Sequence, residues 1–287
     1  MNAYNDTARI VVVTGASTGI GKACALELAA RGFRVYAGVR RTEDGEALRT
    51  EAPERITPIM LDVTRDEDVQ AAARAIEAAC GERGLYGLVN NAGIAVAGPL
   101  EFLPAFHLRR QFEVNVIGVM AVTQAFLPLL RRGCGRIVNI GSVSGRLAMP
   151  LLGPYAASKA AIAFLSDALR AELRSAGVEV ALIEPGVIRT PIWQKSGREG
   201  TALRAMLPKE CEAAYGKALD RIEERVAVLE RMGAPPEAVA RKAAHAMLAR
   251  RPRTRYLVGR GARLQIWLGK LLPDRLRDWF FAKALGL

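Results

Sequence analysis

The fold is indicated by one stretch, Thr14-Gly15-Ala16-Ser17-Thr18-Gly19-Ile20-Gly21, which lies between the apolar run Arg9–Thr14 and the amphipathic segment Gly19–Arg31. The run reads RIVVVT and is apolar on both faces, which predicts a strand buried between two layers. The glycines permit a tight turn, and the amides at the start of the next helix can face a pyrophosphate. The alternative is that these glycines only make a tight turn between a strand and a helix.

Short apolar runs and longer amphipathic segments alternate along most of the chain. The predicted strands are Arg9–Thr14, Phe33–Val39, Ile56–Leu61, Tyr86–Asn90, Gly135–Gly141, Val178–Glu184 and Arg255–Val258. The predicted helices are Gly19–Arg31, Glu43–Thr50, Asp66–Cys80, Pro104–Leu130 and Tyr155–Ala176, with another starting at Pro235-Pro236-Glu237. This alternation predicts an α/β fold in which a doubly wound parallel sheet of about seven strands is flanked by helices. Ligands of such sheets bind beyond the carboxyl ends of the strands, so we expect the chemistry there.

No Gly/Ser- or Pro-rich linker divides residues 1–287, so one domain is expected. The segment Thr190–Met232 is helical, rich in charge and inserted between the sixth and seventh strands. Insertions at this edge of a sheet often cover a site, so residues 188–232 are predicted to form a lid. Residues 261–287 are predicted to form an amphipathic, basic extension.

Two further segments follow predicted strands and fit a dinucleotide. Asp62-Val63 follows the third strand, where the carboxylate can accept a hydrogen bond from an adenine amino group. Asn90-Asn91-Ala92-Gly93 ends the fourth strand, and its small residues would let the backbone approach a cofactor. The alternative for this second segment is a simple turn.

Composition excludes several classes of protein. The four cysteines form no CxxC pair and the two histidines no HxxxH or HExxH motif, so neither a disulfide framework nor a metal site is expected. The first nine residues lack the apolar core of a signal peptide, and no run of about 18 uncharged apolar residues indicates a transmembrane helix. The reduced cytoplasm is therefore the expected compartment.

The net charge of +12 is partly concentrated at the end of the chain. Residues 250–287 hold ten Lys and Arg against two Asp. Such a balance can serve nucleic acid, an anionic membrane surface, an anionic cofactor or solubility alone. Binding to nucleic acid is not expected, because no zinc spacing, RNP pattern or basic strand with interleaved aromatic residues is present.

With the motifs that follow, the sequence resembles the short-chain dehydrogenase/reductase family. The likeness runs from about Arg9 to Thr190 and continues more weakly to about Val258. Tyr155-Ala156-Ala157-Ser158-Lys159 matches the YxxxK element, and Ser142 stands thirteen residues before Tyr155. Asn115 matches the helix asparagine of the family. The resemblance implies a single Rossmann-type domain, a dimer or tetramer, and Ser142, Tyr155, Lys159 and Asn115 as the catalytic set. It also implies a nicotinamide cofactor held by Gly15, Ser17, Thr18, Gly19, Ile20, Gly21, Arg40, Arg41, Asp62, Val63, Asn91, Ala92, Gly93, Tyr155, Lys159, Pro185, Gly186, Ile188 and Thr190.

These residue types suit transfer of a hydride between an alcohol and a nicotinamide. Tyr155 and Lys159 are four residues apart, so they share one face of a helix. A free tyrosine has a pKa near 10, and an adjacent ammonium is expected to lower it, so that Tyr155 can act as general acid and base. Ser142 would polarise the substrate oxygen. From the resemblance, Lys159 would hold the ribose and Asn115 a water relay.

The cofactor is predicted to be NADP(H), with NAD(H) as the alternative. Users of NAD commonly place an acidic residue at the end of the second strand, whereas this chain has Val39 followed by Arg40 and Arg41. A guanidinium suits a 2′-phosphate. The alternative is that the two arginines are a solvated surface pair, and Thr18 stands where many NADP-using relatives have a basic residue.

The substrate is predicted to be a hydrophobic alcohol, ketone or aldehyde, because the candidate wall residues are apolar. They are Ala95, Val96, Leu147, Met149, Leu151, Leu152, Val187, Ile188, Ile192, Trp193, Leu203, Met206 and Leu207. Patterns such as PGVIRTPIW resemble the branch with 17β-hydroxysteroid and retinol dehydrogenases, which implies a steroid, retinoid or lipid. The alternative for the apolar lid residues is plain helix packing.

Residues 263–287 combine tryptophan, leucine and phenylalanine with five Lys and Arg. This mixture is typical of a helix at a membrane surface, and also of a tail that packs on the lid or another subunit. Peripheral membrane contact is therefore one prediction and structural packing the other. Two alternatives to the whole functional reading remain: a catalytically silent protein that senses nucleotides, and an NAD-dependent alcohol dehydrogenase of the same fold.

Overall fold

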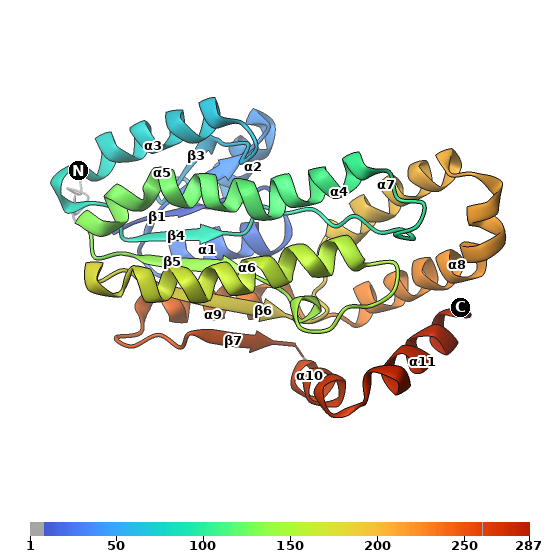
Figure 1. Ribbon diagram of the computed structural model, residues 1–287. Coiled ribbons are helices and arrows are strands. Elements are labelled where there is room, and N and C mark those ends of the chain that lie inside the picture. Colours follow the sequence, from blue (N-terminus) through green and yellow to red (C-terminus); the bar gives the residue numbers. More distant parts are fainter. Residues whose placement is uncertain (1–8, 260) are drawn as a thin grey trace.

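The computed structural model describes residues 9–259 and 261–287, without the side chains of residues 193–195, 198–199, 225–227, 229–230, 263–265, 268 and 270. Its centre is a seven-stranded sheet in which every pairing is parallel, in the order β3-β2-β1-β4-β5-β6-β7 (Figure 1). The strands are β1 Ile10–Val13, β2 Arg34–Val39, β3 Ile56–Met60, β4 Gly87–Asn90, β5 Arg136–Ile140, β6 Glu179–Pro185 and β7 Arg255–Val258. The predicted parallel, doubly wound sheet is confirmed.

Helices cover both faces of the sheet, as the strand sequences predict. In β1, Val11 and Val13 face a core built with α1 and α9, while Ile10 and Val12 face a core built with α3, α5 and α6. All four residues of β1 are buried, which explains why the strand is apolar throughout. The helices that flank the sheet are α1 Gly19–Ala30, α2 Thr42–Glu51, α3 Asp66–Cys80, α4 Ala105–Phe112, α5 Gly118–Arg132, α6 Gly153–Glu172 and α9 Pro236–Leu248.

The predicted helix Pro104–Leu130 is not one continuous α-helix. A π-helical turn, η2 (Glu113–Ile117), separates α4 from α5. This composite helix, Ala105–Arg132, is the one described stretch that is long and apolar enough to cross a membrane, and half of its most apolar window is buried inside the protein. The buried part packs on the sheet, so the same apolar residues serve the core. Helix α6 also starts earlier than predicted, at Gly153.

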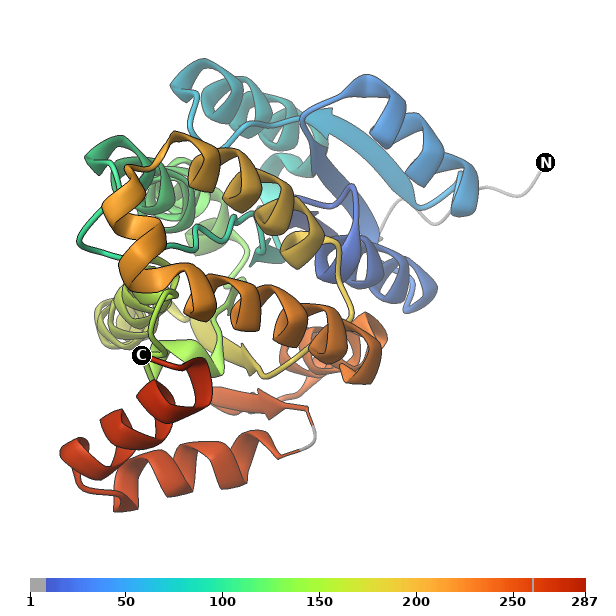
Figure 2. The same cartoon turned by 90° about the vertical axis from the view of Figure 1, so that its right-hand side faces the viewer.

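The remaining helices gather at the carboxyl ends of the strands. They are α7 Ile192–Met206, α8 Lys209–Met232, α10 Ala262–Leu271 and α11 Asp274–Leu285. Figure 2 shows α7 and α8 lying across this edge of the molecule, with α11 beside them. The strand order reverses between β1 and β4, and the loops after these two strands open at the same edge. The fold therefore brings the segments that carry the predicted site together under α7 and α8.

Candidate active site

A cavity of about 1100 Å³ opens at the carboxyl edge of the sheet. It is larger than the roughly 300–1,000 Å³ of a pocket for one small molecule, so it has room for a dinucleotide and a substrate together. Most predicted site residues line it: Gly15, Ser17, Thr18, Gly19, Ile20, Arg40, Asp62, Val63, Asn91, Ala92, Gly93, Ser142, Tyr155, Lys159, Pro185, Gly186, Ile188 and Thr190. Three predicted site residues, Gly21, Arg41 and Asn115, do not line it.

The glycine loop has the geometry that a dinucleotide needs. Gly15 and Gly19 have φ of 62° and 58°, in the left-handed region that favours glycine. A Cβ on Gly21 would lie 2.2 Å from the Gly15 carbonyl oxygen, so a side chain there would break the turn. Helix α1 starts at Gly19 without a side-chain cap and without an acidic residue in its first turn. Its first amides are therefore open to a phosphate, and the residues present fit the predicted cofactor.

The segment after β4 is tied to this glycine loop. The Asn91 side-chain amide donates to the carbonyl oxygens of Thr14 and Gly15, each at 3.0 Å. The Thr14 hydroxyl oxygen accepts hydrogen bonds from the amides of Asn91 and Ala92, each at 3.0 Å. These hydrogen bonds fix the segment after β4 against the glycine loop. The segment therefore does more than make a simple turn.

The two arginines after β2 differ. Both are exposed, but Arg40 lines the cavity, whereas Arg41 forms two hydrogen bonds with Asp44, at 3.0 and 2.7 Å. Asp62, which also lines the cavity, accepts hydrogen bonds from the amide and hydroxyl of Thr64. Burial acts to raise the pKa of Asp62, but these hydrogen bonds and the nearby Arg40 outweigh it, so the carboxyl has a pKa below its ordinary value. An ionised acceptor and a cation therefore meet at this end of the cavity.

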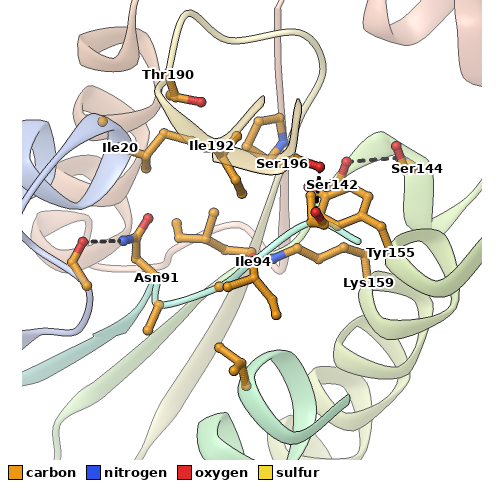
Figure 3. A pocket seen from close by; sticks show the side chains of 18 of the residues that line it. Ile20, Asn91, Ile94, Ser142, Ser144, Tyr155, Lys159, Thr190, Ile192 and Ser196 are labelled. Atoms are coloured by element: carbon orange, nitrogen blue, oxygen red, sulfur yellow. Dashed lines mark hydrogen bonds between the residues drawn. The ribbon is translucent and has the colours of Figure 1, made fainter. Parts of the chain in front are cut away.

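Three of the four predicted catalytic side chains meet in the middle of the cavity (Figure 3). Tyr155 and Lys159 come from the first turns of α6, and Ser142 follows β5. The Lys159 amino group donates to the Ile140 carbonyl oxygen at 2.8 Å and lies 5.8 Å from the centre of the Tyr155 ring. All three residues are buried.

Burial controls the protonation of this group. It raises the pKa of Tyr155 above its ordinary value, and a hydrogen bond with Ser142 acts in the opposite direction. Burial also lowers the pKa of Lys159 to about 8. The sequence led us to expect that Lys159 lowers the pKa of Tyr155, but in this structure desolvation dominates. Tyr155 is consequently a neutral phenol at neutral pH, which suits a proton donor.

The lowered pKa of Lys159 makes stability depend on pH. Below about pH 8 the ammonium is present in both the folded and the unfolded chain, and its burial opposes folding. Above that pH the folded protein releases the proton while the unfolded chain keeps it to about pH 10, so the free energy of unfolding rises. We expect wild type to gain about 2 kcal/mol over Lys159→Met between pH 7 and pH ~9.5. Urea denaturation of both proteins at both pH values measures this, and parallel pH dependence of the two would contradict it.

Asn115 lies in the π-helical turn and is buried. Its side-chain oxygen accepts from the Ile94 amide at 2.9 Å, and its amide donates to the Ile94 carbonyl oxygen at 3.0 Å and to the Ser158 hydroxyl at 3.1 Å. Among the described residues, its hydrogen bonds thus go to Ile94 and Ser158 rather than to Lys159. Asn115 shapes the segment after β4, and its role in a water relay stays a prediction.

Sequence reasoning missed Gln111, one helical turn before Asn115. Its side chain, fully buried, binds the Val96 amide at 2.7 Å, the Ile94 carbonyl at 3.0 Å and the Ser158 hydroxyl at 3.2 Å. The signal in the sequence was the spacing of four residues between two amide side chains on one helix face. Together the two side chains fix the loop that carries Gly93 and Ile94.

It also missed an ion-pair network behind Ser142. Glu184 is 1% exposed and accepts two hydrogen bonds from Arg146, both at 2.6 Å, and one from Arg255 at 3.1 Å. Arg255 also pairs with Asp167 of α6. The network joins the loop after Ser142 to the end of β6 and to the helix that carries Tyr155. The signal was a second carboxylate, Glu184, which follows the apolar run Val180–Ile183 of the same strand.

The apolar wall is partly as predicted. Ala95, Met149, Leu152, Val187, Ile188 and Ile192 line the cavity. Val96, Leu147, Leu151, Leu203, Met206 and Leu207 do not line it, and Met206 is 69% exposed. The side chain of Trp193 lies outside the described residues, as do those of Arg263, Leu268 and Lys270 from the predicted extension. Sequence reasoning missed Ser196, Ile222, Phe280, Phe281 and Ala284, which also line the cavity.

Comparisons with known proteins agree with this geometry. The model of the family described as short chain dehydrogenase matches residues 9–200. The chain is 38% identical to an NADPH-dependent 3-dehydrocapnine reductase from Ornithobacterium rhinotracheale, over 96% of this chain and 97% of that protein. It is 40% identical to human retinol dehydrogenase 5, over 93% of this chain and 86% of that protein.

Among solved structures, the chain is similar to a short chain dehydrogenase from Burkholderia cenocepacia in complex with NADP. The identity is 26% and the TM-score 0.69, over 95% of this chain and 96% of that one. The likeness therefore extends through the segments that cover the cavity as well as through the sheet.

Proposed function

The chain belongs to the short-chain dehydrogenase family, and from this premise we propose its cofactor, substrate class and catalytic residues. The relatives named above are a reductase and a retinol dehydrogenase. The predicted family and its branch with retinol dehydrogenases are confirmed, and the chain is an oxidoreductase. We propose that it interconverts a hydrophobic alcohol and its ketone or aldehyde with NADP(H), with Tyr155 as general acid and base.

One observation carries this proposal: Ser142, Tyr155 and Lys159 meet in the cavity that starts at the glycine loop. When bound, NADPH supplies the hydride that adds to the carbonyl carbon. Tyr155 gives its phenolic proton to the carbonyl oxygen, and Ser142 holds that oxygen by a hydrogen bond. The raised pKa of Tyr155 keeps this proton in place at neutral pH until the oxygen becomes basic.

Lys159 is proposed to stabilise the phenolate that Tyr155 leaves. Its amino group is anchored on the Ile140 carbonyl, and a positive charge at 5.8 Å from the ring favours the phenolate. The same amino group is proposed to bind the ribose hydroxyls. Asn115 is proposed as a positioning residue for the loop at Ile94.

NADP(H) is proposed as the preferred cofactor because Arg40 lines the cavity at the end of β2. A carboxylate at this strand end would repel a 2′-phosphate, and β2 ends in Val39 instead. The relative from O. rhinotracheale is NADPH-dependent, and the B. cenocepacia structure holds NADP, which supports this assignment. Arg41, paired with Asp44, is not proposed as a ligand.

The substrate is proposed to be steroid-, retinoid- or lipid-like. Apolar side chains from five separate segments line the cavity that holds Tyr155, and a retinol dehydrogenase is among the relatives. Residues 188–232 are proposed to act as the lid of a single domain spanning the chain. The Ser196 hydroxyl of α7 donates to the Ala95 carbonyl oxygen at 2.6 Å, which holds the lid against the loop after β4.

A homodimer or homotetramer is proposed as the working form. The outer faces of α4, α6 and η2 expose large apolar side chains: Phe106 at 56%, Leu108 at 40%, Ile117 at 54% and Phe164 at 77%. Exposed apolar residues on neighbouring helices are typical of an interface between subunits. A monomeric mass in light scattering at micromolar concentration would contradict this proposal.

Contact with a membrane surface is proposed for α10 and α11. Trp267, Leu271 and Trp279 are 59%, 58% and 51% exposed, and the surrounding segment is strongly basic. The alternative from the sequence, packing on the lid, is present within the chain, because α11 contacts α8. Sedimentation with anionic vesicles tests the proposal: equal binding of wild type and a Trp267→Glu, Trp279→Glu variant would count against it. The cytoplasmic compartment stays a prediction.

A panel of hydrophobic ketones, aldehydes and alcohols with NADPH, NADP⁺, NADH and NAD⁺ tests the function. We expect turnover with hydrophobic members of the panel and a higher kcat/KM with NADP(H). Binding of NADPH without turnover of any panel member would favour the silent sensor, and a higher kcat/KM with NAD(H) would favour the NAD-dependent alternative.

A further inference from the structure

One wall of the cavity comes from the last helix. Phe280, Phe281 and Ala284 of α11 line the same cavity as Tyr155. This helix lies outside residues 9–200, which the family model matches. The wall therefore lies outside the segment that the family model matches.

Helix α11 is fixed in place by one buried residue and a contact with α8. Leu285 is 1% exposed and packs with Leu151 and Leu152 from the loop before α6 and with Ala218 and Ile222 of α8. Figures 1 and 2 both show α11 beside α8. Because Leu285 is anchored in this cluster, the helix face that carries it is turned toward the cavity.

The helix has two faces with different roles. Phe281 stands four residues before Leu285 and shares its face, together with Ala284. Trp279 does not line the cavity; it is 51% exposed and stacks with the Lys283 ammonium, 4.8 Å from the ring centre. Phe280 lines the cavity and is still 49% exposed, which places it at the rim.

The lining near α11 is apolar. Met149 and Leu152 from the loop before α6 and Ile222 from α8 join the two phenylalanines. Ser142 and Tyr155, the polar side chains that a reacting oxygen needs, line the same cavity, and Tyr155 stands three residues after Leu152. A ligand that reaches both the apolar lining and these polar side chains therefore has a carbonyl or hydroxyl at one end and an apolar body at the other.

We infer that Phe281, with Phe280 at the rim, determines which substrates are accepted, by packing against an extended apolar body that reaches from the reacting carbon to α11. The inference rests on the proposed function, because that places the reacting carbon beside Tyr155. It assigns the specificity for long substrates to the last helix of the chain. Short substrates react without touching this helix.

A homologous series of methyl ketones tests this assignment. For Phe281→Ala we expect kcat/KM to fall roughly 10- to 50-fold with the longest ketones and less than about twofold with the shortest. Phe280→Ala is expected to show a smaller loss of the same kind. Trp279→Ala, on the outer face of the same helix, is the matched control for Phe281→Ala. Because the Trp279 ring packs edge-on against Phe280 at 5.0 Å, this variant is expected to lose no more than Phe280→Ala does. KM for NADPH is expected to stay unchanged in all three.

A second variant adds bulk instead of removing it. Ala284→Phe is expected to shift the preferred ketone to a shorter chain, because the new ring takes up cavity volume beside α11. Equal losses at every chain length in Phe281→Ala, or no loss at all, would overturn the inference.

Direct binding separates this inference from the proposed reaction. Calorimetric titration of the longest ketone into the protein with NADP⁺ measures affinity whether or not turnover occurs. If wild type binds the ketone but reduces none of the series, the proposed reaction fails while the comparison of Phe281→Ala with Trp279→Ala still decides the role of α11. Equal affinity of these two variants, or no detectable binding by wild type, would overturn it.

Discussion

Tyr155→Phe is expected to lower kcat about 1,000-fold while NADPH still binds within a few-fold of its wild-type affinity. The change removes one hydroxyl and keeps the ring, so the buried volume is conserved. The hydroxyl lost is the one that bonds with Ser142 and is proposed to protonate the carbonyl oxygen. The loss of NADPH absorbance under saturating substrate measures kcat, and quenching of protein fluorescence measures binding.

Two controls define this expectation. Ser142→Ala removes a hydrogen bond to the substrate oxygen without removing the proton donor, so we expect a smaller loss, about 100-fold. Urea denaturation checks that both variants remain folded. If Tyr155→Phe retained more than about a tenth of wild-type kcat, the general acid would have to be another group.

Arg40→Ala is expected to lower kcat/KM for NADPH by about 10- to 100-fold, because a hydrogen bond to a charged group contributes about 1.5–3 kcal/mol. NADH lacks the 2′-phosphate, so its kcat/KM is expected to change less than about threefold. The ratio of the two kcat/KM values isolates the phosphate contact from any general damage to the site.

Arg41→Ala is the matched control for Arg40→Ala. Arg41 carries the same charge one residue later, but its guanidinium is held by Asp44 outside the cavity lining. We expect both cofactors to keep their wild-type kcat/KM within about twofold, since exposed ion pairs contribute little. An equal loss for both variants would mean that general positive charge, rather than a contact by Arg40, selects the cofactor.

Local patterns predicted the sheet and the glycine loop. Central strands such as β1 and β4 are buried on both faces, so each is a run of apolar residues. Such a run can be recognised in the sequence without knowledge of the strands that pair with it. The glycine loop needs left-handed backbone at Gly15 and Gly19, and that demand is also local. The positions of Tyr155 and Lys159 followed from resemblance together with their spacing along one helix, and that of Ser142 from resemblance and its place thirteen residues before Tyr155.

Contacts between distant segments could not be predicted in the same way. Glu184 binds Arg146 and Arg255, which are 38 and 71 residues away, and no period in the sequence relates them. The contribution of Phe281 to the cavity depends on how Leu285 packs on α8, which is a property of tertiary structure. Assigning the 2′-phosphate contact to Arg40 rather than Arg41 required knowing that Arg41 forms an ion pair with Asp44.

The π-helical turn at Glu113–Ile117 has a consequence for insertions and deletions. One α-helical residue advances the chain by about 100° around the axis, so removing a single residue from the turn would rotate α4 by that angle relative to α5. Gln111 would then leave Ile94 and Ser158, although no residue of the catalytic group had been substituted. The π-helical turn thus sets the rotation between the two helices. With this rotation α5 packs in the core while α4 directs Gln111 toward the segment after β4. The length of that segment therefore matters to the site as much as the identity of its side chains does.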